Sequence, residues 1–174
     1  MKARQLSHRS PAGRAKELDK ICLFQMDYSY PVLPILNSRE ELISLIENNS
    51  VVIIHGATGS GKSTQLPQFI LDYHSQKSAY SNIIVTQPRK IAARSIATWI
   101  SNERNWTLGG IVGYQVGLEK KATEDTRLIY MTTGVLLQKI VAAKSLAEFT
   151  HIFIDEEVVK HNDDFFYETL FQEY

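Results

Sequence analysis

Residues 56–63 read Gly-Ala-Thr-Gly-Ser-Gly-Lys-Ser, a complete glycine-rich pattern that ends in Gly-Lys-Ser. The glycines at positions 56, 59 and 61 allow backbone conformations with positive φ, so that successive amides can turn toward one anion. The β-branched run of residues 51–55 before the pattern predicts a buried parallel strand, and the residues after it predict a helix through about Tyr73. A strand, a glycine-rich turn and a helix in this order predict a loop that binds phosphate groups.

Two side chains of this loop have the chemistry that a nucleoside triphosphate requires. Lys62 is long enough to reach the β- and γ-phosphates, and the Ser63 hydroxyl is a suitable ligand for Mg²⁺. The alternative is a glycine-rich turn that carries a surface lysine, and the completeness of the pattern argues against it.

A pair of acids lies about 90 residues beyond Lys62, where Asp155 and Glu156 follow the apolar residues 152–154. Ligands of α/β sheets bind at the carboxyl ends of the strands, so Asp155 is expected beside the phosphate loop, where it would hold Mg²⁺. Glu156 would orient or deprotonate an attacking water. A solvated acidic end of a strand is the alternative interpretation.

The rest of the chain alternates between strand and helix patterns. Ser38 or Asn37 is expected to cap a helix that contains residues 42–46. Further strands are predicted at residues 83–86, 111–116, 128–131 and 151–154, and helices at residues 90–102 and 133–143. Such repeated strand–helix units predict an α/β fold, a parallel β-sheet with helices on both faces.

Composition sets further limits. The 174 residues suit one domain with a sizeable core, and no apolar run approaches the roughly 20 residues of a membrane span, so no membrane partner is predicted. Cys22 is the one cysteine, which excludes an intrachain disulfide and favours a reducing, intracellular location. The five histidines show no ligand spacing, so no metal other than Mg²⁺ is predicted.

The net charge of zero is unevenly distributed. Residues 155–174 hold seven acidic side chains and one basic side chain, which leaves 18 basic and 12 acidic side chains in residues 1–154. This modest excess permits contacts with nucleic-acid phosphates. Residues 1–27 are predicted to form a flexible basic segment that precedes the domain.

Residues 86–97 read Thr-Gln-Pro-Arg-Lys-Ile-Ala-Ala-Arg-Ser-Ile-Ala, residues 131–137 read Met-Thr-Thr-Gly-Val-Leu-Leu, and the phosphate loop continues through residues 64–69 as Thr-Gln-Leu-Pro-Gln-Phe. In this order and spacing, over about residues 30–156, the chain resembles the DEAH/DExH-box RNA helicases of superfamily 2. Residues 113–119, together with the Arg-Lys pair at 89–90, are similar to the spindle-E subgroup, which acts in the piRNA pathway.

The resemblance implies a RecA-like P-loop NTPase domain in residues 28–174, the first motor domain of an ATP-dependent RNA helicase. It implies catalytic roles for Lys62, Asp155 and Glu156, and Mg²⁺ ligation by Ser63 and Asp155. Contacts with ATP are implied for Gly56, Ala57, Thr58, Gly59, Ser60, Gly61, Lys62, Ser63, Thr64 and Trp99. Contacts with the RNA backbone, without base readout, are implied for Pro88, Arg89, Lys90, Thr132, Thr133 and Gly134. The implied partners are RNA, a second RecA-like domain and proteins of a cytoplasmic, perinuclear RNP granule.

Several positions depart from the family pattern. Val158 stands where the family has a histidine, and His161 is more simply an exposed residue than a displaced substitute. Trp99 stands where many relatives carry an arginine that stacks on adenine; an indole could stack there or belong to the core. Gly117 replaces a basic residue of many relatives.

The chain is also expected to be truncated after the acidic motif, before the second motor domain, so that the fragment alone would be weakly active or inactive. The alternative function is therefore a catalytically impaired nucleotide- or RNA-binding RNP module, or a dimerising fragment, without unwinding activity.

Overall fold

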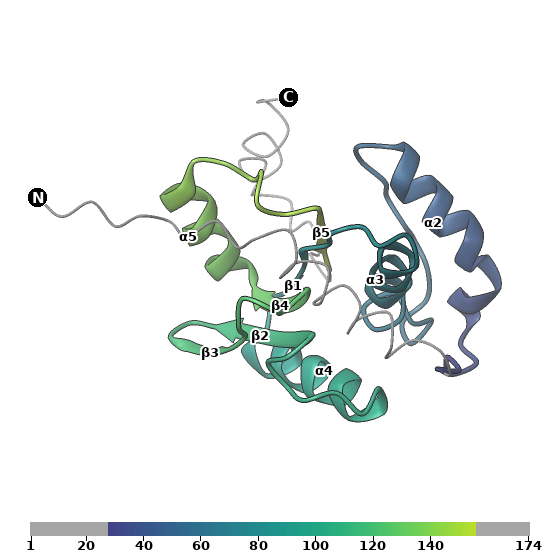
Figure 1. The fold of residues 1–174 in the computed structure, drawn as a ribbon, viewed down its shortest axis with the longest axis horizontal. Helices are drawn as coiled ribbons and strands as arrows, with labels where there is room; N and C mark the ends of the chain where they lie inside the picture. The colour runs from purple at the N-terminus through teal and green to yellow at the C-terminus, as the bar shows by residue number, and fades with distance from the viewer. Residues whose placement is uncertain (1–27, 156–174) are drawn as a thin grey trace, which may run out of the picture.

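The computed structural model describes residues 28–155, which form one sheet with helices around it (Figure 1). The helices are the 3₁₀ helix η1 (Pro34–Ser38) and the α-helices α2 (Arg39–Asn48), α3 (Leu66–Gln76), α4 (Lys90–Glu103) and α5 (Thr133–Ala143). The strands are β1 (Ile83–Gln87), β2 (Val112–Val116), β3 (Glu119–Lys121), β4 (Leu128–Thr132) and β5 (His151–Ile154).

The five strands lie in the order β3-β2-β4-β1-β5. Strands β2, β4, β1 and β5 are parallel, and only β3 runs antiparallel to its neighbour β2. The register places Gln87 beside Thr132 and Thr86 beside Ile154. The carboxyl ends of β4, β1 and β5 therefore meet at one edge of the sheet.

Alternate residues of β1 face opposite sides of the sheet. Ile83 and Val85 belong to the larger core cluster beneath α2, α3 and α4, whereas Ile84 packs with Val135 and Leu136 of α5. Figure 1 shows the same division, with α5 on one side of the sheet and α3 and α4 on the other. The predicted α/β class with helices on both faces of a mostly parallel sheet is confirmed.

The predicted strand at residues 51–55 is wrong. These residues form no ladder with any other described residue, and Ile53 and Val51 are 93% and 57% exposed. Among residues 28–155, β5 is an edge strand and β1 is already paired on both sides. The β-branched run has a high strand propensity, but propensity does not produce a ladder without a neighbouring strand.

Other elements differ from the prediction in smaller ways. Helix α3 begins at Leu66, several residues after the glycine-rich turn. Strand β3 was not predicted; it reads Glu-Lys-Lys, and all three residues are exposed. Ser38 occupies the N-cap position of α2, but its side chain makes no capping hydrogen bond because η1 leads directly into the helix. Helix α5 and strand β5 have the predicted bounds.

A buried arginine connects three parts of the chain on the α3–α4 side. The side chain of Arg104, just after α4, is 2% exposed. Its Nε donates to Gln68 Oε1 at 2.7 Å, and its Nη2 donates to Asp72 Oδ2 and to the Tyr30 hydroxyl, both at 2.7 Å. The guanidinium also lies 3.7 Å from the ring centroid of Tyr28. Burial and the neighbouring Asp72 raise the pKa of Tyr30, which donates its hydroxyl hydrogen to the same carboxylate.

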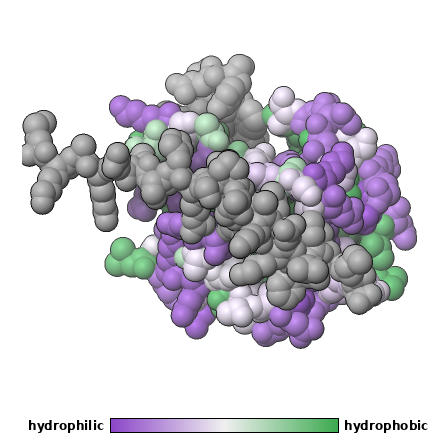
Figure 2. Space-filling view, in the orientation of Figure 1, coloured by the Kyte–Doolittle hydropathy of each residue, from purple (hydrophilic) through white to green (hydrophobic). Residues whose placement is uncertain are grey.

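In Figure 2 the coloured surface is largely hydrophilic, and a hydrophobic group projects over the turn between β2 and β3. Leu118 lies in that turn and is fully exposed. Within residues 28–155, no helix is both long enough and apolar enough to span a membrane.

Candidate nucleotide-binding site

The glycine-rich loop depends on two residues with left-handed backbone geometry. Gly59 has a φ of +79° and Gly61 a φ of +101°. A Cβ on Gly61 would lie 2.8 Å from Ile35 Cγ2, a separation that real Cβ atoms essentially never show. Gly61 is therefore required both for its conformation and for its lack of a side chain. The prediction of positive φ was wrong for Gly56, whose φ lies in the ordinary range.

The loop offers unused donors. Within the described range, the amides of Gly59, Gly61, Lys62 and Ser63 donate to no other residue. The Lys62 ammonium donates to the carbonyls of Gly56 and Ala57 at 2.6 and 2.8 Å. A cation and several free amides in one loop are what an anionic phosphate requires.

A helical turn precedes α3. The Gly61 carbonyl accepts a hydrogen bond from the Gln65 amide at 2.7 Å, so the chain begins to coil before the helix starts at Leu66. Residues 31–35, which we call the entry segment, are hydrogen-bonded to this turn. The Ile35 amide donates to the Ser60 carbonyl at 3.1 Å, and Gln65 Nε2 donates to the Pro31 carbonyl at 2.7 Å.

Tyr130 connects the loop to the sheet. Its ring is fully buried in β4, and its hydroxyl donates to the Ser63 carbonyl at 2.8 Å. Burial first, and then the negative charge of Asp155, raise the pKa of Tyr130 well above its ordinary value. Tyr130 therefore contacts Ser63 and lies within electrostatic reach of Asp155, and the shared Mg²⁺ site of Ser63 and Asp155 stays a prediction.

Asp155 directly follows β5 and is half-buried. Its Oδ2 accepts a hydrogen bond from Nε2 of Gln87, the buried last residue of β1, at 2.5 Å. This bond orients the carboxylate at the sheet edge that also carries the phosphate loop. Glu156, the predicted water-orienting acid, and Val158 lie outside the described residues, as do the residues 1–27 that were predicted to be flexible.

The residues predicted to contact RNA lie along the same sheet edge. Pro88, Arg89 and Lys90 are exposed and lead from β1 into α4, and Arg89 is the N-cap of that helix. The second group is Thr132, which ends β4, with Thr133 and Gly134, which begin α5. The Thr133 hydroxyl is buried, with no hydrogen-bond partner among the described residues.

Trp99 is not a core residue. It is 43% exposed on α4, and it lies about 14 Å along the helix axis from Lys90. The core alternative for Trp99 is therefore wrong, and its contact with adenine stays a prediction. Gly117, the other departure in the described part, lies beside Lys90, because a Cβ there would be 3.5 Å from the lysine Nζ.

Sequence reasoning missed Tyr130 and Gln87. Both stand in apolar strand patterns and carried no motif of their own. The available signal was chemical: a buried phenol and a buried amide each need a hydrogen-bond partner, and both lie near the carboxyl ends of strands.

Comparison with known proteins gives consistent matches. Residues 37–167 match the family described as DEAD/DEAH box helicase. The chain is 73% identical over 148 residues to "ATP-dependent RNA helicase TDRD9" of Rattus norvegicus, and 74% identical over 142 residues to the protein of that name in Homo sapiens. It is 52% identical over 124 residues to "Probable ATP-dependent RNA helicase spindle-E" of Culex quinquefasciatus. These matches cover 85%, 82% and 71% of this chain but only 10%, 10% and 9% of the relatives.

Proposed function

Because the chain belongs to the DEAD/DEAH box helicase family, we propose that it is the part of an ATP-dependent RNA helicase that binds ATP–Mg²⁺ and the RNA backbone. One arrangement supports this proposal: Tyr130 is hydrogen-bonded to a loop that has free amides and a lysine, and it lies within electrostatic reach of Asp155. The whole helicase is the enzyme in this proposal, and this chain supplies one of its nucleotide-binding surfaces.

The residues of the loop fit a triphosphate. Free amides at Gly59, Gly61 and Lys62 would donate to phosphate oxygens, and the Lys62 ammonium would exchange a carbonyl partner for one of them. Ser63 and Asp155 would hold Mg²⁺, which when bound neutralises phosphate charge. Gln87 already occupies Asp155 Oδ2 and so would leave the other carboxylate oxygen for the ion.

Hydrolysis in this proposal uses Glu156 to position water and Lys62 to stabilise the transferring phosphate. The second RecA-like domain would complete the nucleotide site from the opposite side. Trp99 would stack on the adenine.

RNA would cross the sheet edge formed by the ends of β1 and β4. Lys90 would contribute a cation, whereas Thr132, Thr133 and Gly134 would contribute hydroxyls and backbone amides. The unpaired Thr133 hydroxyl supports this assignment, because buried polar atoms normally have a partner. Such contacts bind phosphates and riboses without reading bases.

We further propose a role in piRNA-directed transposon silencing, in a cytoplasmic, perinuclear RNP granule. The support is the similarity to proteins named spindle-E, together with the stretch at residues 113–119. RNP-granule proteins would then be partners of the whole helicase.

Binding measurements on two lysine variants test the two surfaces separately. We expect Lys62→Ala to weaken binding of a fluorescent ATP–Mg²⁺ analogue about 10- to 100-fold, because a charge-assisted hydrogen bond contributes about 1.5–3 kcal/mol. Lys90→Ala should leave nucleotide affinity unchanged. It should weaken binding of single-stranded RNA and reduce the salt dependence of that binding by about one phosphate contact.

Unchanged nucleotide binding in Lys62→Ala would contradict the assignment of the phosphate loop. Turnover is measured on the two-domain helicase, with and without RNA. ATP binding there without RNA-stimulated hydrolysis would favour the catalytically impaired module instead.

A further inference from the structure

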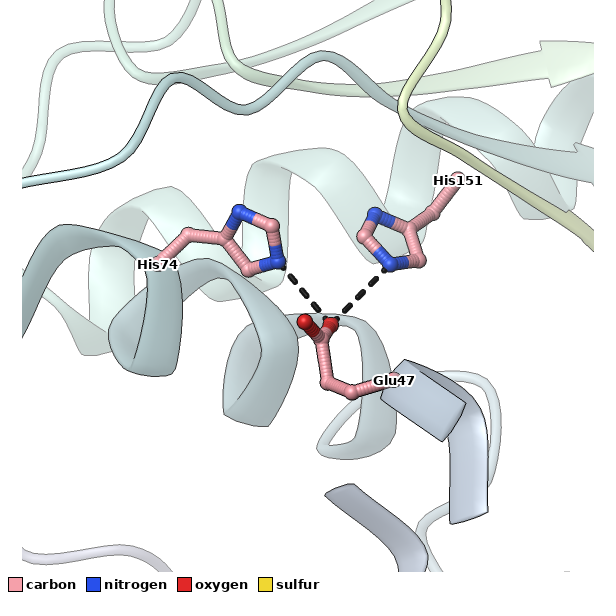
Figure 3. A group of neighbouring side chains, drawn as sticks. All are labelled: Glu47, His74 and His151. Carbon is pink, nitrogen blue, oxygen red and sulfur yellow. Dashed lines mark hydrogen bonds and ion pairs between the residues drawn. The ribbon is translucent and has the colours of Figure 1, made fainter. Parts of the chain in front are cut away.

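A second cluster of polar side chains lies at the other end of β5. Glu47 near the end of α2, His74 in α3 and His151 at the start of β5 point toward one another (Figure 3). Glu47 Oε1 lies 2.9 Å from His74 Nε2 and 3.2 Å from His151 Nε2. One ligand atom from each of the three residues lies within 4.8 Å of the others.

The cluster is partly sheltered from water. The side chains of His74, His151 and Glu47 are 14%, 16% and 24% exposed. The two imidazole rings meet edge to face, with centroids 5.0 Å apart. Three elements that are distant in sequence therefore present nitrogen and oxygen atoms to one small region that solvent still reaches.

The outer nitrogens of both rings have acceptors. His74 Nδ1 lies 3.4 Å from the Tyr80 carbonyl, and His151 Nδ1 lies 3.1 Å from Thr150 Oγ1. Thr150 Oγ1 donates its own hydrogen to the Asn82 carbonyl at 3.2 Å, so it accepts from His151. In the tautomer with a proton on Nδ1, each neutral ring has a lone pair at Nε2 that a cation could bind; in the other tautomer Nε2 donates to Glu47.

His74 Nε2 and His151 Nε2 both face the same oxygen of Glu47, so one cation between them could bind all three residues. Neutral imidazole is the form that binds metal. The acceptors on the outer nitrogens match the outer-sphere contacts that fix the tautomer of metal-binding histidines.

We propose that Glu47, His74 and His151 bind a divalent transition-metal ion of the Zn²⁺ class, with water at the fourth position. Two imidazoles and one carboxylate are a known zinc ligand set. Metal–ligand bonds of about 2.1 Å in a tetrahedron separate the ligand atoms by about 3.4 Å. The two short separations here are 2.9 and 3.2 Å, so small side-chain rotations would suffice.

This site is separate from the nucleotide site. His151 begins β5 and Asp155 follows its end, so the strand length of about 13 Å lies between them. A bound ion would join α2, α3 and the strand that leads to Asp155. The site would therefore act as a structural cross-link, holding the helix after the phosphate loop against the edge of the sheet.

Titration of the metal-free full chain with Zn²⁺ tests the proposal. We expect one ion per chain, and a rise in Tm of about 5–10 °C when free Zn²⁺ is about 100 times Kd. Glu47→Gln and His151→Gln should each weaken Zn²⁺ binding at least about tenfold. His55→Gln is the matched control, because His55 is an exposed histidine outside the cluster, and its affinity should equal that of the unaltered chain.

Circular dichroism of each metal-free variant checks that it folds, and Glu47→Gln keeps an amide of the same shape if a histidine variant does not. Co²⁺ in place of Zn²⁺ gives a second readout, an absorption spectrum of a four-coordinate ion that is lost in His151→Gln. Absence of saturable Zn²⁺ binding, or equal affinity in the cluster variants and His55→Gln, would overturn the proposal and leave a hydrogen-bonded cluster.

Discussion

Replacement of Arg104 by methionine should destabilise this domain strongly. The substitution removes a guanidinium whose three hydrogen bonds hold Tyr30, Gln68 and Asp72 together, and it leaves the Asp72 side chain, itself 9% exposed, without that cation. Methionine retains most of the volume, so loss of packing is a minor part of the effect.

The magnitude follows from the burial of the pair. Removing one partner of a buried ion pair destabilises a protein by about 3–5 kcal/mol. Asp72 keeps the hydrogen bond from the Tyr30 hydroxyl, so the lower end of this range applies. Arg104 Nη1 is buried with no hydrogen-bond partner among residues 28–155, so the ion pair of Arg104 and Asp72 has one unsatisfied donor. We therefore expect a loss of about 3 kcal/mol in the free energy of unfolding, and a decrease in Tm of roughly 6–12 °C.

Arg94→Met is the matched control, because it makes the same chemical change within α4, the helix that ends just before Arg104. Arg94 is 63% exposed and lies 3.9 Å from Glu119, which is 49% exposed. Exposed pairs of this kind contribute about 0–1 kcal/mol. Urea unfolding, followed by circular dichroism and tryptophan fluorescence, measures both variants under the same conditions.

A loss below about 1 kcal/mol for Arg104→Met, or a loss equal to that of Arg94→Met, would refute this reasoning. The double variant Arg104→Met/Asp72→Leu provides a second check. It should be less destabilised than the sum of the single changes, because neither charge is then left alone.

Two further predictions concern the loop and the histidines. Gly61→Ala should reduce the free energy of unfolding by about 2 kcal/mol or more in urea titrations, because it combines a φ of +101° with a Cβ 2.8 Å from Ile35 Cγ2. Gly59→Ala has open space around it and should reduce the free energy of unfolding by about 1 kcal/mol. Equal losses in the two variants would contradict the role of Ile35. Burial and His74 lower the pKa of His151, while Glu47 opposes the shift, so the unfolded chain binds the proton more tightly. In metal-free buffer the free energy of unfolding should therefore fall as the pH drops below about 6.5, and His151→Gln should reduce this slope; an unchanged slope would contradict the assignment.

The elements that sequence patterns predicted well are those whose apolar pattern lies within a few consecutive residues. Helix α5 has apolar residues at helical spacing, and β1 is buried at all five positions. Residues 51–55 have a similar composition to β1, yet they pair with no described strand. Composition indicates the tendency to form a strand, whereas a ladder requires a neighbouring strand to pair with.

The candidate site likewise has features that a local sequence pattern predicts and features that depend on contacts between distant residues. The glycine pattern identified the phosphate loop and its lysine, because the chemistry is contained in eight consecutive residues. Tyr130 and Ser63 are 67 residues apart, and their hydrogen bond exists only because β4 passes beneath the loop. The cluster of Glu47, His74 and His151 has no ligand spacing for the same reason: three separate elements supply its atoms.

The contacts of the entry segment give residues 31–35 control over the shape of the phosphate loop. This segment is hydrogen-bonded to Ser60 on one flank of Gly61 and to Gln65 on the other, and Ile35 fills the space that a side chain on Gly61 would need. A displacement of the segment by one or two ångströms would release both flanks together. The geometry of the glycine-rich loop is thereby tied to the position of the residues just ahead of η1.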